Sequence, residues 1–167
     1  MRMALPLRRF ALTVHITCSV GWLGAVIAFL ALAVVGLVSQ GSLTERGADL
    51  AMELIGWLVI VPLCIASLLT GIVQSVGTVW GLFRHYWVLF KLAMNVLATI
   101  VLLMYMQMTT GDAAEVGGPG PVLHAGAALL LLLVATALSV YKPQGVTPHG
   151  MRRALYGRPE LGQRSIP

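Results

Sequence analysis

Charged side chains are scarce in this chain. Only 10% of its 167 residues are Asp, Glu, Lys or Arg, while 58% are hydrophobic. Soluble domains carry charge on roughly a quarter of their residues, so this composition excludes an ordinary soluble domain. Four stretches have no charged residue at all: Phe10–Val38, Leu54–Phe83, Leu92–Gly111 and Val116–Tyr141. Each can supply the ~20 apolar residues with which a helix crosses a bilayer.

Cysteine and catalytic motifs are also sparse. The two cysteines, Cys18 and Cys64, fall inside apolar stretches and form no C-x-x-C pair, which argues against zinc or thioredoxin-type chemistry. No acid–base pair lies within an apolar stretch and no nucleophile motif appears, so hydrolase chemistry is not expected. Whether the chain is an enzyme stays open.

The apolar stretches predict an all-α, polytopic membrane protein. We expect a four-helix up-down bundle within residues 1–142, because short connections make successive helices antiparallel. Pro62 predicts a kink near Leu58–Pro62 in the second helix, and residues 41–50 are expected to form a polar loop. The expected spans are about 10–38, 51–79, 87–110 and 122–141. Residues 143–167, rich in proline and glycine, are expected to form a flexible basic tail.

Basic residues fall almost entirely on one side of the predicted membrane. When the connections are numbered alternately, only Arg46 lies on the acidic side, and the other side holds Arg2, Arg8, Arg9, Arg84, Lys91, Lys142, Arg152, Arg153, Arg158 and Arg164. Basic loops are retained in the cytoplasm, so both termini are expected there, in a bacterial plasma (inner) membrane. The net charge of +5 is then explained by topology and lipid headgroups, not by nucleic acid.

Polar side chains inside the first span are the main clue to a site, because such groups are costly in lipid. One helix face carries His15, Cys18, Ser19 and Trp22, and roughly the opposite face carries the small residues Thr13, Thr17, Gly21, Gly24 and Ala28. Small residues permit close helix packing. His15 has two interpretations: a neutral histidine bonded to a backbone carbonyl, or a ligand or proton carrier.

Lys91 opens the third span and has two interpretations as well. It either extends to the membrane boundary, or it faces inward and meets His15 at the same depth. In the second case both residues would serve an anionic or redox ligand.

A second group of residues lies toward the opposite side. Thioethers and imidazole suit Cu(I), and His124 is expected near Met104 and Met108, with Met52 and Glu53 at the start of the second span. Met106 faces away from the other two methionines on a helix. The alternative is that these methionines pack or face lipid.

The order of these residues resembles a known superfamily. His15-x6-Trp22-x-Gly24, then Thr70-Gly71, then Tyr86 and Lys91-Leu92, resemble landmarks of the CopD-like (copper-resistance D) superfamily of membrane proteins. The layout is also similar to that of the J-type membrane protoporphyrinogen oxidases. Overall the chain most resembles a bacterial family of predicted integral membrane proteins of unknown function in that superfamily. The resemblance implies a four-helix bundle with His15 and Lys91 at its site, and copper or b-type haem as ligand.

Three functions follow as expectations. The first is a redox protein with haem b near the cytoplasmic face, where His15 is an axial ligand beside Trp22 and Lys91. Met94 is the one soft candidate for the iron's other side, a five-coordinate haem is equally allowed, and the propionates would lie near Arg8, Arg9, Arg84 or Lys91. The second is a non-catalytic subunit or scaffold, as a homo-oligomer or in a larger membrane complex. The third is a copper-handling protein that uses His124, Met104 and Met108.

Overall fold

The computed structural model describes residues 4–77, 86–111 and 118–141, and within them every regular element is helical. The elements are α1 (Leu5–Val38), α2 (Leu43–Ile55), the π-helical turn η1 (Gly56–Ile60), α3 (Val61–Gly77), α4 (Tyr86–Gly111) and α5 (Gly120–Tyr141). Because α2, η1 and α3 follow one another without a break, they form one long segment. Four helical segments in these ranges are long and apolar enough to cross a membrane: Leu5–Val38, Leu43–Val76, Tyr86–Met108 and Gly120–Tyr141. The prediction of an all-α, multi-pass four-helix bundle is confirmed.

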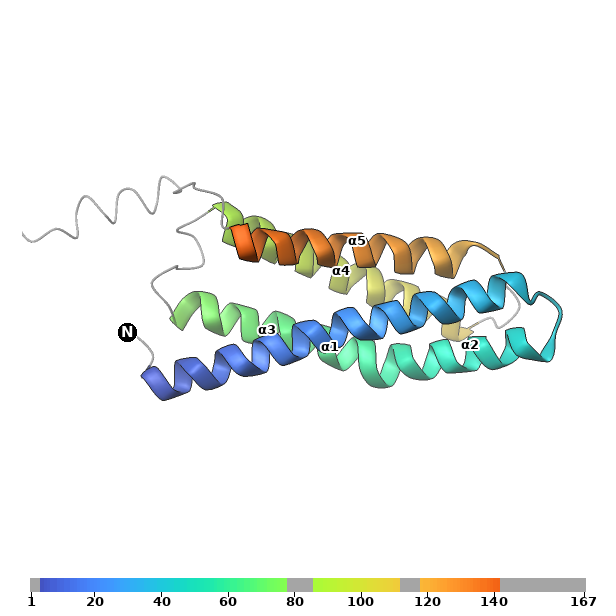
Figure 1. Cartoon of the computed structure of the whole chain (residues 1–167), viewed down its shortest axis with the longest axis horizontal. Coiled ribbons are helices and arrows are strands. Elements are labelled where there is room, and N and C mark those ends of the chain that lie inside the picture. Colours follow the sequence, from blue (N-terminus) through green and yellow to red (C-terminus); the bar gives the residue numbers. More distant parts are fainter. Residues whose placement is uncertain (1–3, 78–85, 112–117, 142–167) are drawn as a thin grey trace, which may run out of the picture.

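The four segments run alternately up and down (Figure 1). Helix α1 packs against α2, α3 and α5, while α4 packs against α3 and α5. Helices α1 and α4 begin, and α3 and α5 end, at the same end of the bundle, which we call the N-terminal end. The α1–α2 connection lies at the opposite end.

A seam of regularly spaced residues directs α1 into the bundle. His15, Trp22, Phe29 and Gly36 are seven residues apart, and the last three are buried. A seven-residue repeat keeps one face of a helix toward its neighbours in left-handed, nearly antiparallel packing. Val26 and Ala33 of α1 are buried as well. The other segments complete this core with Met52, Ile60, Cys64, Ala125 and Leu132. His15 therefore lies in line with the buried core of α1.

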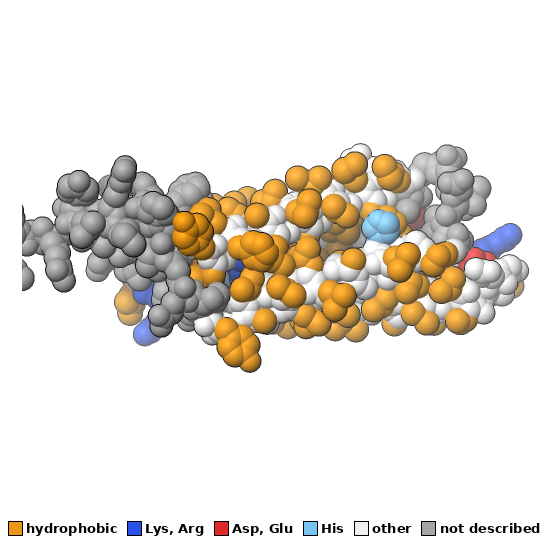
Figure 2. Space-filling view, turned by 90° about the horizontal axis from the view of Figure 1, so that it is seen from above, with side chains coloured by type: hydrophobic (Ala, Val, Ile, Leu, Met, Phe, Trp, Pro, Cys, Tyr) orange, Lys and Arg blue, Asp and Glu red, His pale blue; other side chains and the backbone are white. Residues whose placement is uncertain are grey.

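The outside of the bundle is apolar along its length (Figure 2). Large side chains such as Phe10, Leu58 and Leu130 are 66–70% exposed. A water-soluble monomer rarely exposes continuous apolar surface of this extent, whereas lipid chains cover it without penalty. The acidic side chains in this view lie at the end where α1 joins α2.

The second segment begins earlier than the expected residue 51. Helix α2 starts at Leu43, so most of the expected loop 41–50 is helical. Ser42 caps this helix: its Oγ accepts the Glu45 backbone N–H at 3.3 Å, and the Glu45 carboxylate accepts the N–H of Gly41 at 2.5 Å. This reciprocal arrangement is close to a capping box, whose Ser-x-x-Glu pattern stands in the sequence. Ala48 and Met52 are buried, so the polar start of α2 still packs on the bundle.

The expected irregularity before Pro62 is present as a π-helical turn. Proline has no N–H, so the carbonyl four residues before it loses its helical partner. The backbone widens here over Gly56–Ile60, and the Val61 N–H bonds to the Gly56 carbonyl five residues earlier. The structure thus has a π-helical turn where a kink near Leu58–Pro62 was expected.

Some sequence expectations concern residues outside the described ranges. They include the Trp80–His85 part of the turn before α4, the acidic part of the connection before α5, and the tail 143–167. His85 and His149 lie there too. The described parts of the last two spans begin at Tyr86 and Gly120, within two residues of the expected starts.

Candidate functional site

A cavity of about 310 Å³ lies among α1, α3 and α4, toward the N-terminal end of the bundle. Its polar lining comes from all three helices and includes Arg8, His15, Gln74, Ser75, Lys91 and Asn95. His15 and Lys91 therefore share one cavity, as the inward-facing interpretation of Lys91 expects. Ligand pockets usually measure about 300–1,000 Å³, so this one is at the small end of that range.

The His15 ring is held by α3 through one nitrogen. Nδ1 lies 3.1 Å from the Ser67 carbonyl oxygen and 3.0 Å from Thr70 Oγ1. A carbonyl can only accept, so Nδ1 carries the hydrogen and donates it. The Thr70 hydroxyl donates to the Ala66 carbonyl at 2.6 Å, which leaves its oxygen free to accept from His15. In the neutral ring Nε2 then keeps its lone pair.

This hydrogen bond fits both interpretations of His15, as a neutral histidine bonded to a backbone carbonyl and as a ligand. A carbonyl bond to Nδ1 is the contact that commonly fixes the tautomer and orientation of a histidine that binds metal through Nε2. The half-buried side chain is anchored like an interfacial histidine and oriented like a ligand.

Close packing of α1 on α3 supports this orientation. A Cβ on Gly71 would come within 3.2 Å of His15 Cε1, so the ring packs closely against α3 because residue 71 has no side chain. One turn along α1, Ser19 Oγ and Ser67 Oγ are 2.8 Å apart in a further hydrogen bond between the two helices. The Ser19–Ser67 bond thus holds α1 and α3 together beside the His15 ring.

Lys91 reaches across to the fourth span. Its Nζ donates to Ser139 Oγ at 2.6 Å, and the Ser139 hydroxyl donates to the Ala135 carbonyl at 2.9 Å. The side chain is half-buried. Of the described residues that line the cavity, Arg8 and Lys91 are cationic and none is acidic. This charge balance suits an anionic ligand.

Asn95 supplies a polar group that sequence reasoning gave no role. It lies one turn after Lys91 on α4, is 8% exposed, and its Oδ1 has no hydrogen-bond partner among the described residues. A buried acceptor without a partner costs about 1–3 kcal/mol. A ligand or water that donates a hydrogen bond in the cavity would remove this penalty. The only signal in the sequence was an amide four residues after an intramembrane lysine.

The other residues expected around a haem lie elsewhere. Trp22 is 3% exposed and lines a second cavity, between α1, α4 and α5, not the cavity of His15. Met94 is half-buried and is in the described lining of neither cavity. Of the expected set, the structure brings together Arg8, His15 and Lys91 in the lining of one cavity.

The expected copper residues do not line a common cavity: His124 lines the second cavity, whereas Met104 and Met108 are absent from its described lining. Met104 and Met108 are 54% and 70% exposed, whereas Met106 is buried against Gly56. His124 stacks on Tyr105 with ring centroids 4.4 Å apart. Within the described ranges no three His, Cys, Asp or Glu side chains gather as a metal site would require. Cys18 and Cys64 are free thiols, and Cys64 Sγ lies 3.1 Å from Thr99 Oγ1.

The small-residue face of α1 is largely uncovered. Thr13, Thr17, Gly24 and Ala28 are exposed, and a Cβ on Gly24 would meet no atom within 4 Å. Gly21 is the exception, because a Cβ there would come within 3.2 Å of Leu63 on α3. In the described residues the histidine face, not this face, makes most of the internal contacts of α1.

The chain was compared with protein-family models, curated proteins and solved structures. No protein-family model, curated protein or solved structure gives a significant match to the chain.

Proposed function

We propose that this multi-pass membrane protein binds a b-type haem at the His15 cavity and acts as a redox protein of the bacterial plasma membrane. The observation that carries the proposal is the His15 ring, which is anchored through Nδ1 and keeps Nε2 available beside two cationic side chains. A histidine is a common axial ligand of haem iron, and cationic side chains are suitable partners for the propionates.

The His15 cavity fits only part of a haem. The cavity of about 310 Å³ accommodates one edge of a haem rather than the whole macrocycle. His15 is the one imidazole in its described lining, and Met94 does not line it. Among the described lining residues, His15 is therefore the one candidate ligand for the iron.

Each residue then has a distinct task. His15 Nε2 would ligate the iron, while the Ser67 carbonyl keeps the ring in one tautomer. Arg8 and Lys91 would neutralise the propionates by charge-assisted hydrogen bonds. The orphan Asn95 Oδ1 would accept a hydrogen bond from a bound water or small ligand. The haem itself would supply one-electron chemistry, and the surrounding apolar helices would keep bulk water from it.

Topology supports a cytoplasmic location for the site. The cavity lies at the end of the bundle near Arg8, Arg9 and Lys91, and basic residues at span ends are retained in the cytoplasm. We accordingly propose that both termini are cytoplasmic.

An absorbance spectrum tests the proposal. Full-length protein, expressed with a haem precursor and purified in detergent, is expected to show a Soret band that shifts on dithionite reduction. His15→Ala is expected to abolish the band, and Lys91→Met to weaken haem retention with little change in the spectrum. His124→Ala is the matched control, since this histidine belongs to the other end of the bundle, and should leave the band unchanged. A featureless wild-type spectrum after haem supplementation would remove the proposal.

A second candidate is a subunit or scaffold role, favoured by the exposed Thr13, Thr17, Gly24 and Ala28. Small exposed residues allow another membrane helix to approach closely. Gly24→Leu is then expected to break a homo-oligomer or a larger complex in cross-linking from native membranes, whereas His15→Ala would leave it intact. A protein that is monomeric in the wild-type strain as well as in the Gly24→Leu strain would exclude this role.

Copper handling by His124, Met104 and Met108 stays a prediction, and the structure adds no observation in its favour. Unchanged copper tolerance in a His124→Ala/Met108→Ala strain would exclude it.

A further inference from the structure

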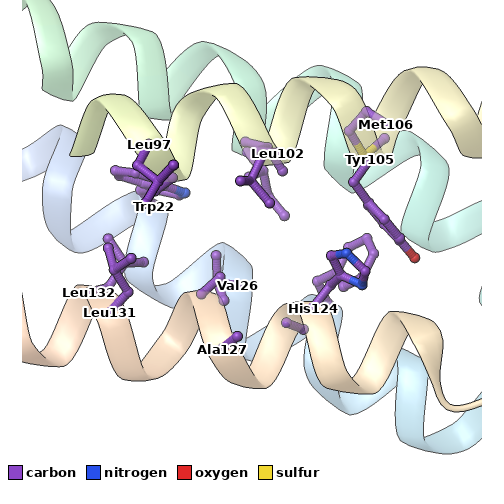
Figure 3. A pocket seen from close by; sticks show the side chains of 16 residues that line it. Trp22, Val26, Leu97, Leu102, Tyr105, Met106, His124, Ala127, Leu131 and Leu132 are labelled. Carbon is purple, nitrogen blue, oxygen red and sulfur yellow. The ribbon is translucent and has the colours of Figure 1, made fainter. Parts of the chain in front are cut away.

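The second cavity is an elongated apolar slot between α4 and α5, with α1 as its floor (Figure 3). Its volume is about 260 Å³. Trp22, Val26 and Phe29 of α1 form the floor, and Ala125, Ala127 and Ala128 form much of the α5 wall. Because these α5 residues are small, the space between α4 and α5 stays open. The slot is separate from the His15 cavity and has no task in the proposed haem site.

The side chains of the slot that accept hydrogen bonds well lie at one end, because the indole N–H of Trp22 at the other end only donates. Tyr105 and His124 lie side by side at the polar end, while Trp22, Leu97, Leu131 and Leu132 surround the other end. The Tyr105 and His124 rings stack with an interplanar angle of 27°. The polar end thus presents flat rings next to an otherwise apolar channel.

The hydrogen bond of His124 determines what this end can bind. Nδ1 lies 3.0 Å from the Gly120 carbonyl oxygen, which only accepts, so Nδ1 donates and the neutral ring keeps a lone pair on Nε2. Nε2 therefore accepts a hydrogen bond from a hydroxyl and repels a carbonyl oxygen.

The depth of the slot matches a membrane amphiphile. His124 is four residues, about 6 Å, from the start of α5, and Leu132 is about 12 Å farther along the helix. The polar end thus lies near the membrane surface and the apolar end toward the bilayer centre. The small volume admits one ring and part of one chain, not a two-chain phospholipid.

We propose that this slot binds a hydroxylated aromatic ring on a single apolar tail, which is the chemistry of a membrane quinol. The ring hydroxyl donates to His124 Nε2, the ring lies against the Tyr105–His124 stack, and the tail follows the alanine-lined wall toward Trp22. The reduced form binds more tightly than the quinone, because the quinone offers only acceptors to the Nε2 lone pair. The proposal concerns binding and does not depend on haem.

Binding of decylubiquinol and decylubiquinone to full-length protein in phospholipid nanodiscs tests this proposal. We expect the quinol to bind about fivefold more tightly than the quinone, the ratio that corresponds to about 1 kcal/mol for one neutral hydrogen bond. His124→Phe keeps a ring for stacking but has no Nε2, so it should remove the preference for the quinol. Ala128→Phe should fill the slot and abolish binding of both forms.

Matched variants keep the experiment decisive. Leu123→Phe adds an aromatic ring on the lipid-exposed face beside His124 and should leave binding unchanged, as should His15→Ala. Equal affinity for quinol and quinone in the wild type would overturn the proposal. So would a phospholipid retained in the slot by native mass spectrometry and not displaced by the quinol. Loss of the Soret band in His15→Ala with quinol binding intact would separate this site from the haem site.

Discussion

Of the described glycines, Gly56 leaves the least room for a Cβ, because Met106 of α4 packs directly against it. Met106 is 2% exposed, and a Cβ on Gly56 would overlap its terminal methyl and come within 2.7 Å of its sulfur. The Met106 sulfur and methyl are the end of a flexible side chain, but Met106 is buried, so a branched side chain at residue 56 requires Met106 and its neighbours to move together. We expect Gly56→Val to lower the free energy of unfolding by about 1–3 kcal/mol, as overpacking typically does. Unfolding by SDS titration in mixed micelles measures it.

Two further variants identify the cause. Met106→Ala opens space beside residue 56, so Gly56→Val/Met106→Ala should be more stable than the sum of the two single effects predicts, as contacting residues are rarely additive. Gly24→Val is the matched control, because a Cβ at Gly24 meets no atom within 4 Å. An equal loss of stability in Gly24→Val would show that valine in place of a helical glycine, not the contact with Met106, is responsible.

Individual site residues differed in how far the sequence could predict them. The sequence placed His15 on one helix face with Trp22, but whether that face points inward and whether the ring is a ligand both stayed open. Lys91 had two open interpretations, since only the partner helix decides whether an ammonium extends outward or bonds to Ser139. The separation of Trp22 from the His15 cavity could not be read from one helix, because their seven-residue spacing spans about two turns, and two residues of the same face that far apart along the axis contact different neighbours. Asn95 gained a role only once its burial and missing partner were known.

Helix α2 shows how charge can hide the start of a membrane segment. Residues 43–53 were expected to be partly loop because Glu45, Arg46, Asp49 and Glu53 lie there. Hydropathy reports what lipid accepts, whereas a helix beyond the apolar core can continue with its polar side in the headgroup region. The local signal was the Ser42-x-x-Glu45 cap, which satisfies backbone N–H groups that would otherwise lack partners.

This cap makes a separate prediction for the element. Ser42→Ala removes the acceptor for the Glu45 N–H and is expected to cost about 1 kcal/mol, within the usual range for an N-cap. Faster hydrogen exchange should be confined to the first turn of α2 and leave α3 unaffected, because the rest of the segment packs on α1. Thr44→Ala, an exposed change two residues on, serves as control. Faster exchange throughout α2–α3 would mean that the cap supports the whole segment.

The number of spans and the basic residues at their ends predict how the protein is oriented in the membrane. Four spans place the start of α1 and the end of α5 on the same side of the membrane, and the basic residues near these ends favour the cytoplasm. A fluorescent protein fused after Pro167 should therefore fold and fluoresce, whereas alkaline phosphatase inserted between Gln40 and Gly41 should be active outside the cytoplasm. The reverse pattern would overturn the proposed topology and would set the His15 cavity in the outer leaflet. Haem would then have to reach His15 from outside the cytoplasm, and the quinol slot would open toward the inner leaflet. Orientation thus decides from which side each proposed ligand must enter.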